Sequence, residues 1–496
     1  MNLKTYILVL LGAGVIYGLT CAPGVLWQDS GMIQYRVWHN DIEGSLGLAL
    51  AHPLYYLMAL GAKQVPVGEF GHRINLMTAL ISAVAIANIF LLVSMWTRQK
   101  LAGLVAALSL MLSHSFWRHG AICETDNLFI ALLLGELIML LQYCRTEKKG
   151  YLYGLGFLNG LALAQHMMAL FGFVCYGIFL VVILVQKKIR IRHMAVIGLF
   201  WIVGALPYEY LVVKTLVQTG DWAGTISSAL FGASYQQQVL NTVITGRIIK
   251  ENFLYLALNF PTPNILLAGL GIWVLLKKTP ERKYAVVFGA LMLIFLGFAS
   301  RYTVVDRYSF FIPFYTFAAV LIGLGAGVLA KSKGRLIWAV LMLVCTVLPI
   351  GAYAVGPVWA KKMDITLGTK RVIPYRDDYK WFLQPWRCGE KGPGKFARES
   401  LEGVPEGAVI YADNTTVYPL LYMQEIKGIG RQIKVVSAIA GSEGAPELNE
   451  ENMMRLAQEK KLYVVTPQKI YCPDYLLENC VFKPAGKLYK VVPHQE

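Results

Sequence analysis

The feature that most constrains this chain is a series of apolar runs of membrane-spanning length. Eleven runs fall near residues 5–22, 74–96, 101–115, 127–144, 151–166, 168–186, 194–212, 264–276, 284–300, 308–330 and 336–356. A helix needs about 20 apolar residues to cross about 30 Å of hydrocarbon. Hydrophobic residues make up 56% of the 496 positions, more than a soluble domain can bury. The sequence therefore predicts a mainly α-helical, polytopic membrane protein with about 11 transmembrane helices.

The net charge is +16, and the basic residues behind it are distributed according to the order of these runs. Lysine and arginine collect in alternate turns, near 98–100, 145–149, 187–192, 277–283 and 331–335, where the only acids are Glu147 and Glu281. The positive-inside rule places these turns and the N-terminus in the cytoplasm. The first run has no convincing cleavage site, so we expect a retained span rather than a signal peptide. The positive-inside rule thus explains the positive net charge, and we expect no nucleic-acid partner.

Three long segments then lie on the extracytoplasmic side. Residues 23–73 and 213–263 contain amphipathic stretches, which we expect to form helices in the membrane interface. Residues 357–496 alternate strand-like and helical runs, which is typical of an α/β domain. We predict a membrane domain at 1–356 and an extracytoplasmic α/β domain at 357–496. Cys472 and Cys480 lie in the second domain, where oxidation is possible, but the sequence does not fix a pairing.

Acidic residues gather on that same side, and each can have either of two roles. Asp29 follows the first span and acts either as a base at the membrane surface or as a helix cap. Glu124 and Asp126 open the fourth span, where acids commonly offset the helix dipole. With Asp29 they are also suited to share a proton or to hold a divalent cation. The spacing does not choose between these readings.

Basic residues on the outer side have similar alternatives. Arg301 and Arg307 flank the start of the tenth span and either bind phosphate or, for Arg307, pair with the preceding aspartate. His166 either binds phosphate or makes an interhelical hydrogen bond. Arg247 and Lys250 either meet lipid headgroups or neutralise a lipid-linked phosphate. The sequence has no P-loop and no GxGxxG after a strand, so a nucleotide-dependent mechanism has no support.

Several stretches taken together resemble one known family. They are "WQDSG", "LALAHPLYYLMALG", "GHRINLMTALISA", "FWRHGAICETDNLFIALL", "VDRYSFFIPFY" and "GAVIYADNTTVYPLLYMQEIKGIGRQIKVVS". In order and spacing they are similar to the protein O-mannosyltransferase-like family of GT-C membrane glycosyltransferases. The resemblance implies an inverting enzyme that takes a sugar from a polyprenyl-phosphate carrier on the extracytoplasmic face.

The resemblance also implies roles for residues of this chain. Asp29 matches the catalytic base, with Glu124 or Asp126 as the second acidic site. The residues available to bind the donor phosphate are Arg118, His119, His166, Arg301 and Arg307. From the residues themselves we also expect Asp29 and Asp126 to be ligands of any Mg²⁺ or Mn²⁺ ion. We expect the substrate to be positioned by His52, Arg73, Arg247 and Lys250. Met32 stands where the family usually has glutamate, which leaves the acceptor and the metal requirement open.

We therefore expect a glycosyltransferase in a bacterial inner membrane, with a cytoplasmic N-terminus and a periplasmic C-terminal domain. It would move mannose or a similar hexose to a hydroxyl of a protein, a glycan or a lipid. The alternative from another class is a transporter or flippase, which typically carries ionisable residues within its spans. Glu136 and Glu209 are among the few such residues here, which favours the enzyme.

Overall fold

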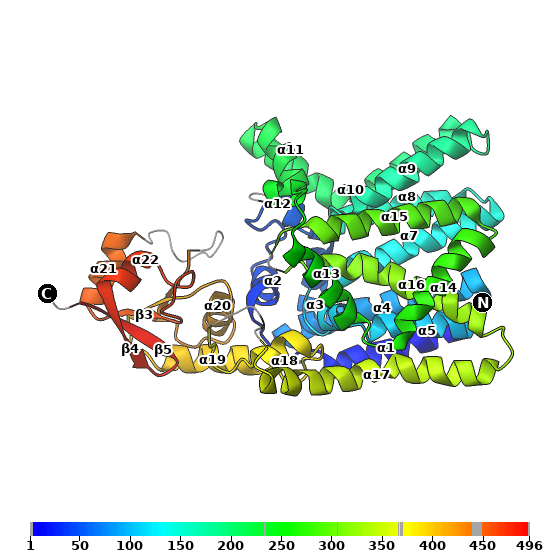
Figure 1. The fold of residues 1–496 in the computed structure, drawn as a ribbon. Coiled ribbons are helices and arrows are strands. Elements are labelled where there is room, and N and C mark those ends of the chain that lie inside the picture. The colour runs from blue at the N-terminus through cyan, green and yellow to red at the C-terminus, as the bar shows by residue number, and fades with distance from the viewer. Residues whose placement is uncertain are drawn as a thin grey trace.

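The computed structural model describes residues 3–232, 235–304, 306–365, 367, 371–438 and 449–494. It consists of a large helical bundle with a small sheet at one end (Figure 1). The helices of the bundle and of the segments over its end are α1 (Leu3–Thr20), α2 (Gln28–Trp38), η1 (Leu48–Leu50), α3 (Pro53–Lys63), α4 (Phe70–Thr97), α5 (Lys100–Met111), α6 (His114–Gly120), α7 (Asp126–Thr146), α8 (Gly150–Gln165), α9 (Ala169–Val185), α10 (Ile191–Thr219), α11 (Trp222–Phe231), α12 (Gln236–Leu240), α13 (Gly246–Asn259), η2 (Pro263–Leu266), α14 (Leu267–Trp273), η3 (Val274–Lys278), α15 (Arg282–Arg301), η4 (Ser309–Phe311), α16 (Ile312–Leu329) and α17 (Arg335–Lys362).

The helical architecture confirms a mainly α, polytopic membrane protein. Among the described residues, seven helices are long and apolar enough to span a membrane, and up to nine if each bent pair counts as one span. The bends are 73° between α5 and α6 and 112° between α13 and the helix that follows it. Each of the eleven apolar runs falls on helix, but the expected number of eleven spans is not confirmed.

Side-chain contacts hold three of the basic turns together at one end of the bundle. Arg145, after α7, donates to Glu281, before α15, over 2.7 Å. Lys188 pairs with Glu147, and Lys283 donates to the side chain of Gln186. This end therefore collects the lysines and arginines that the sequence analysis assigns to the cytoplasm.

The sheet lies at the opposite end of the molecule, beyond α17 (Figure 1). Its strands are β1 (Val409–Tyr411), β2 (Lys434–Val436), β3 (Leu462–Val464), β4 (Cys480–Ala485) and β5 (Leu488–Pro493), in the order β2-β1-β3-β5-β4. The first three are parallel, with Ile410 opposite Val435 and Tyr463, and β5 is antiparallel to β3 and β4. The helices around the sheet are α18 (Asp378–Leu383), α19 (Gly392–Glu402), α20 (Val417–Glu425), α21 (Glu450–Gln458) and α22 (Asp474–Asn479).

The C-terminal segment and the first outer segment share one hydrophobic core. Buried side chains of α2, α3 and the start of α4 pack against those of α19, α20 and β1. Tyr35 of α2 donates to Glu425 over 2.8 Å. A Cβ at Gly31 would lie 2.5 Å from the carbonyl oxygen of Leu26 and 3.1 Å from the Cβ of Tyr418, so only glycine fits at this contact. Helix α2 is thus fixed by the C-terminal segment, and Asp29 with it.

One local expectation is changed by the structure, and the question of Cys472 and Cys480, which the sequence left open, is answered. The amphipathic stretch expected as one interfacial helix in the second outer segment forms two, α12 and α13, because residues 241–245 are not helical. Asn241 explains the break, because its amide donates to the carbonyls of Val243 and Arg301. Cys472 and Cys480 are both buried free thiols.

Candidate functional site

Asp29 lies in the first turn of α2, at the junction of the bundle and the C-terminal segment. The N-cap of α2 is Trp27, and no side chain caps it, so the cap interpretation of Asp29 is not supported by the structure. Instead Asp29 accepts a side-chain hydrogen bond from Asn414. The backbone N–H of Gln28 donates to the carbonyl of Thr415 over 3.3 Å. The turn around Asn414 therefore orients the carboxylate from a position almost 400 residues away.

The surroundings of Asp29 favour its neutral form. Burial raises the pKa of Asp29 to about 6, the nearby charge of Asp306 adds to the rise, and the Asn414 hydrogen bond opposes it. Burial also raises the pKa of Asp306. Both side chains nevertheless remain accessible to water, so they line a recess that is enclosed by protein but wet. A carboxylate of this kind accepts a proton near neutral pH, as a general base must.

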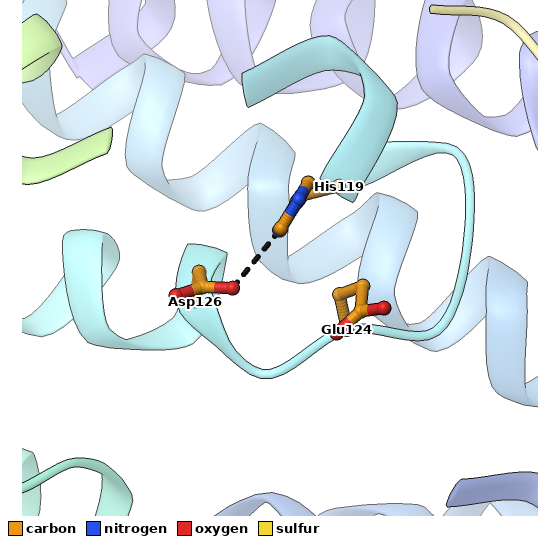
Figure 2. A group of neighbouring side chains, drawn as sticks. All are labelled: His119, Glu124 and Asp126. Carbon is orange, nitrogen blue, oxygen red and sulfur yellow. Dashed lines mark hydrogen bonds and ion pairs between the residues drawn. The ribbon is translucent and has the colours of Figure 1, made fainter. Parts of the chain in front are cut away.

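A second acidic cluster lies next to this recess, formed by His119, Glu124 and Asp126 (Figure 2). One ligand atom from each lies within 4.8 Å of the others. The Nδ1 of His119 is 2.9 Å from a carboxylate oxygen of Asp126, and Ser30 donates to Glu124 over 3.1 Å. Ser30 follows Asp29 directly, so its hydrogen bond to Glu124 links this cluster to the turn that carries Asp29.

Glu124 is the residue of this cluster that holds a proton most readily. Burial raises its pKa well above the ordinary value, and the charges of Asp29 and Asp126 raise it further. Asp126 is the first residue of α7, whose N-cap Thr125 makes no capping hydrogen bond. The structure therefore uses Asp126 to bind His119 rather than to cap the helix.

The cluster has ligand chemistry suited to a divalent cation. One imidazole nitrogen and two carboxylate oxygens are a donor set that fits Mn²⁺ better than Mg²⁺, which prefers oxygen ligands alone. Asp29 is not a member of this group. The geometry thus differs from the expected pair of Asp29 and Asp126 in placing His119 and Glu124 beside Asp126.

Two histidines close another side of this cluster. The rings of His52 and His166 lie 5.2 Å apart, and the Nδ1 of His52 donates to the carbonyl of Gln165 over 2.6 Å. The Nδ1 of His166 accepts from the backbone N–H of Met168, which leaves its Nε2 as the protonated nitrogen. Burial, together with His52, lowers the pKa of His166 to about 3. His166 is therefore neutral and offers a hydrogen-bond donor, not a positive charge.

Buried positive charge is found instead at Arg118 and Arg387. Both guanidinium groups donate to the carbonyl of Trp381 and lie 4.9 and 4.7 Å from its ring centroid. They are 4% and 3% exposed, and the Nε of each has no hydrogen-bond partner. Among the described residues no carboxylate lies within ion-pair distance of either. Burial next to Arg118 lowers the pKa of Arg387 to about 9.

Tyr308 joins these arginines to the acidic cluster. Its ring centroid lies 5.5 Å from the guanidinium carbon of Arg118 and 5.9 Å from the ring of His119. Its phenol is buried, and the charges of Arg118, Asp306 and Glu124 affect its pKa. The arrangement thus places two under-neutralised cations beside the carboxylates, as an anionic leaving group would require.

The other predicted phosphate ligands have protein partners. Arg301 donates to the carbonyls of Val239 and Asn241. Arg307 pairs with Glu251 over 2.7 Å, so it does not pair with the preceding aspartate. These arginines hold the second outer segment against the bundle.

The other residues predicted to position the substrate are either exposed to solvent or make contacts within the fold. Arg247 pairs with Glu251 and its side chain is 87% exposed, and Lys250 is also exposed. Arg73 donates to the carbonyl of Lys63 over 3.1 Å. Of the predicted positioning residues, only His52 lies beside the acidic cluster.

A buried ion pair fixes the turn that carries Asn414. Arg371 binds both carboxylate oxygens of Asp413, over 2.6 and 2.9 Å, and donates to Thr415 over 2.7 Å. Its guanidinium carbon lies 3.8 Å from the ring centroid of Tyr471. A bidentate, stacked arginine holds its partner in one geometry, so the turn is rigid.

Comparison with known proteins matches this architecture. Residues 46–191 match the family described as protein O-mannosyl-transferase TMEM260 N-terminal domain. Protein O-mannosyl-transferase TMEM260 of Mus musculus is 25% identical over 368 residues, which are 68% of this chain and 51% of the mouse protein. The N-terminal part of the chain is thus similar to this O-mannosyltransferase family. The chain spans about half the length of the mouse relative.

Solved structures share the fold of this chain. ArnT from Cupriavidus metallidurans, bound to undecaprenyl phosphate, superposes with a TM-score of 0.60 over 99% of this chain and 98% of its own, at 13% identity. The Archaeoglobus fulgidus oligosaccharyltransferase tethered to an acceptor peptide gives a TM-score of 0.50 over 99% of this chain and 74% of its own, also at 13% identity. Both likenesses show that the chain has the fold of these GT-C proteins. Together with its apolar helices they support an integral membrane protein.

Sequence reasoning missed three residues of the candidate site. Arg387 and Trp381 come from "KWFLQPWRCGE", which the sequence places in the C-terminal α/β domain and not in the site. Asn414 lies in the quoted "DNTT" stretch but was not assigned to the site. A tryptophan and an arginine in a short linker at the membrane surface are the only local signals that point to a buried role.

Proposed function

We propose that this protein is an inverting glycosyltransferase that moves a hexose, mannose in the first instance, from a polyprenyl-phosphate carrier to an acceptor hydroxyl. The observation that carries the proposal is the placement of Asp29, a carboxylate with a raised pKa, beside a second acidic cluster and two buried arginines. The likeness to an O-mannosyltransferase and to a structure bound to undecaprenyl phosphate supports this class of donor.

In this mechanism Asp29 is the general base. It accepts the proton of the acceptor hydroxyl while that oxygen attacks C1 of the sugar, and the bond from C1 to the phosphate oxygen breaks. Polyprenyl phosphate leaves from the opposite face, so the configuration at C1 is inverted. Asn414 holds Asp29 toward the acceptor, because its hydrogen bond favours the charged carboxylate.

The leaving phosphate gains negative charge as the bond breaks. Arg118 and Arg387 would receive it, since each has unsatisfied N–H capacity and low exposure. His166 would add a neutral donor through Nε2. A divalent cation held by His119, Glu124 and Asp126 would supply further positive charge to the phosphate. Without one, the high pKa of Glu124 lowers the negative charge that the donor meets.

The position of the chain in the membrane follows from the same proposal. The acidic site would face the extracytoplasmic side of a bacterial inner membrane, with the basic turns and the N-terminus in the cytoplasm. The sheet beyond α17 would then belong to the extracytoplasmic domain at 357–496. The acceptor would be a protein, a glycan or a lipid that reaches this recess from water.

An in-vitro transfer assay tests the proposal. Purified full-length protein is given a polyprenyl-phosphate mannose donor, and sugar transfer to candidate acceptors is measured together with the anomeric configuration of the product. Wild type should form an inverted product, and Asp29→Asn should lose it. Asp221→Asn is the matched control, because Asp221 only caps α11 at an exposed position. Movement of the donor across proteoliposomes without any product would instead identify a flippase and refute the proposal.

A further inference from the structure

A cavity of about 750 Å³ opens at the end of the bundle that carries the basic turns. It lies between α1, α4, the start of α5 and α7, at the opposite end of the molecule from the C-terminal sheet (Figure 1). None of its lining residues belongs to the site around Asp29. Its volume is in the range of small-molecule sites.

The cavity is elongated along the helix axes. Its lining runs along α4 from Leu91 to Arg98 and along α7 from Ile138 to Arg145. Seven residues at 1.5 Å each extend about 10 Å along a helix. Leu91 and Ile138 form its deep apolar end, and arginine and lysine form its mouth. This is the polarity of a phospholipid that lies parallel to the spans, with its headgroup at the membrane surface.

The mouth of the cavity carries positive charge that the protein does not neutralise. Arg98 and Lys100 are exposed, and in the described part of the chain neither has a carboxylate within ion-pair distance. Arg145 adds a third cation, although it also binds Glu281. Ser94 also lines the cavity. A bound anion would offset the positive charge of Arg98 and Lys100.

We propose that this cavity binds one anionic phospholipid of the leaflet that the basic turns face. The phosphodiester lies between Arg98 and Lys100, and an acyl chain follows Leu91 and Ile138 beside α1. A lipid fits better than a soluble anion because the deep wall is apolar and because only 11% of the spanning window of α1 is buried by the protein. The charge at the mouth selects an anionic headgroup over a zwitterionic one.

Native mass spectrometry of the full-length protein in mixed phosphatidylglycerol and phosphatidylcholine tests the proposal. Wild type should retain one phosphatidylglycerol, and Arg98→Gln with Lys100→Gln should bind it on the order of tenfold or more weakly. Lys331→Gln with Lys333→Gln is the matched control, because it removes two exposed charges from another basic turn. Leu91→Trp, which fills the deep end and keeps the charge, should also lose the lipid.

Each other outcome would overturn the proposal. Equal retention by wild type and the Arg98 and Lys100 variant would exclude the site. An equal loss in the Lys331 and Lys333 control would show general charge attraction. Retention of phosphatidylcholine as strongly as phosphatidylglycerol would exclude headgroup selection. Stabilisation by glycerol phosphate alone, equal to that by phosphatidylglycerol, would identify a soluble-anion site. None of these readouts depends on sugar transfer, so the result stands apart from the proposed function.

Discussion

Replacement of Asp29 by asparagine should separate activity from stability. The pKa of Asp29 is raised from 3.8 to about 6, so the folded protein disfavours the charge. At 1.36 kcal/mol per pKa unit, this shift lowers the free energy of unfolding by about 3 kcal/mol above pH 6. Because the side chain is exposed to water, we expect screening to reduce the cost to about 1 kcal/mol. Asp29→Asn should therefore be slightly more stable than wild type at neutral pH, while transfer falls by about 10²–10⁴-fold with loss of the base.

The sign of this effect depends on pH. A carboxyl group whose folded-state pKa is raised costs stability only where it is charged in the unfolded chain, which is above about pH 4. Thermal unfolding of the two proteins should coincide at pH 4, diverge between pH 4 and 6, and differ most above pH 6. Wild-type transfer should fall about tenfold per unit below pH 6, as the base becomes protonated.

The control for this prediction is the same substitution at a structural carboxylate. Asp413→Asn breaks the buried pair with Arg371 and should destabilise the protein by about 3 kcal/mol. Our reasoning would be refuted if Asp29→Asn lowered the melting temperature as Asp413→Asn does, or if it kept wild-type transfer. The first result would make Asp29 a structural residue, and the second would exclude it as the base.

Three further predictions concern the residues around Asp29. Asn414→Ala removes a hydrogen bond that lowers the pKa of Asp29. The acidic limb of the pH profile of sugar transfer should therefore move to higher pH. An unchanged acidic limb would contradict the hydrogen bond between Asn414 and Asp29. Arg387→Gln should raise the KM for the donor on the order of tenfold, measured by donor titration, with a smaller effect on the KM for the acceptor. Mn²⁺ should raise the melting temperature of wild type but not of His119→Gln, and an equal rise in both would exclude His119 as a ligand.

The spans could be predicted from sequence because length and hydropathy are local properties. Each apolar run lies mainly on helix. The number of spans could not be predicted as well, because the bends after α5 and α13 depend on packing against other helices. The strands β1, β2 and β3 coincide with the runs "GAVIYAD", "QIKVVSA" and "KLYVVTP".

The site was only partly accessible for a related reason. The cluster of His119, Glu124 and Asp126 lies within eight residues of one loop, so sequence proximity predicts its assembly. By contrast, Arg307 looked like a phosphate ligand but binds Glu251, 56 residues away. Arg387 falls in the stretch predicted as the C-terminal domain but lies beside Arg118. Long-range partners decide whether an arginine is neutralised, and one sequence does not give them.

The shared core of α2 and α20 sets the time at which a newly made chain can become active. Tyr35 and Glu425, which bond across this core, are 390 residues apart. Ribosomes add about 5–20 residues per second, so α2 emerges roughly 20–80 seconds before its partner. During this interval the part of α2 that packs on α20 has no partner, and Asp29 lacks Asn414. We therefore expect sugar transfer to begin only after nearly the whole chain has been synthesised, which keeps incomplete chains in the membrane from consuming donor.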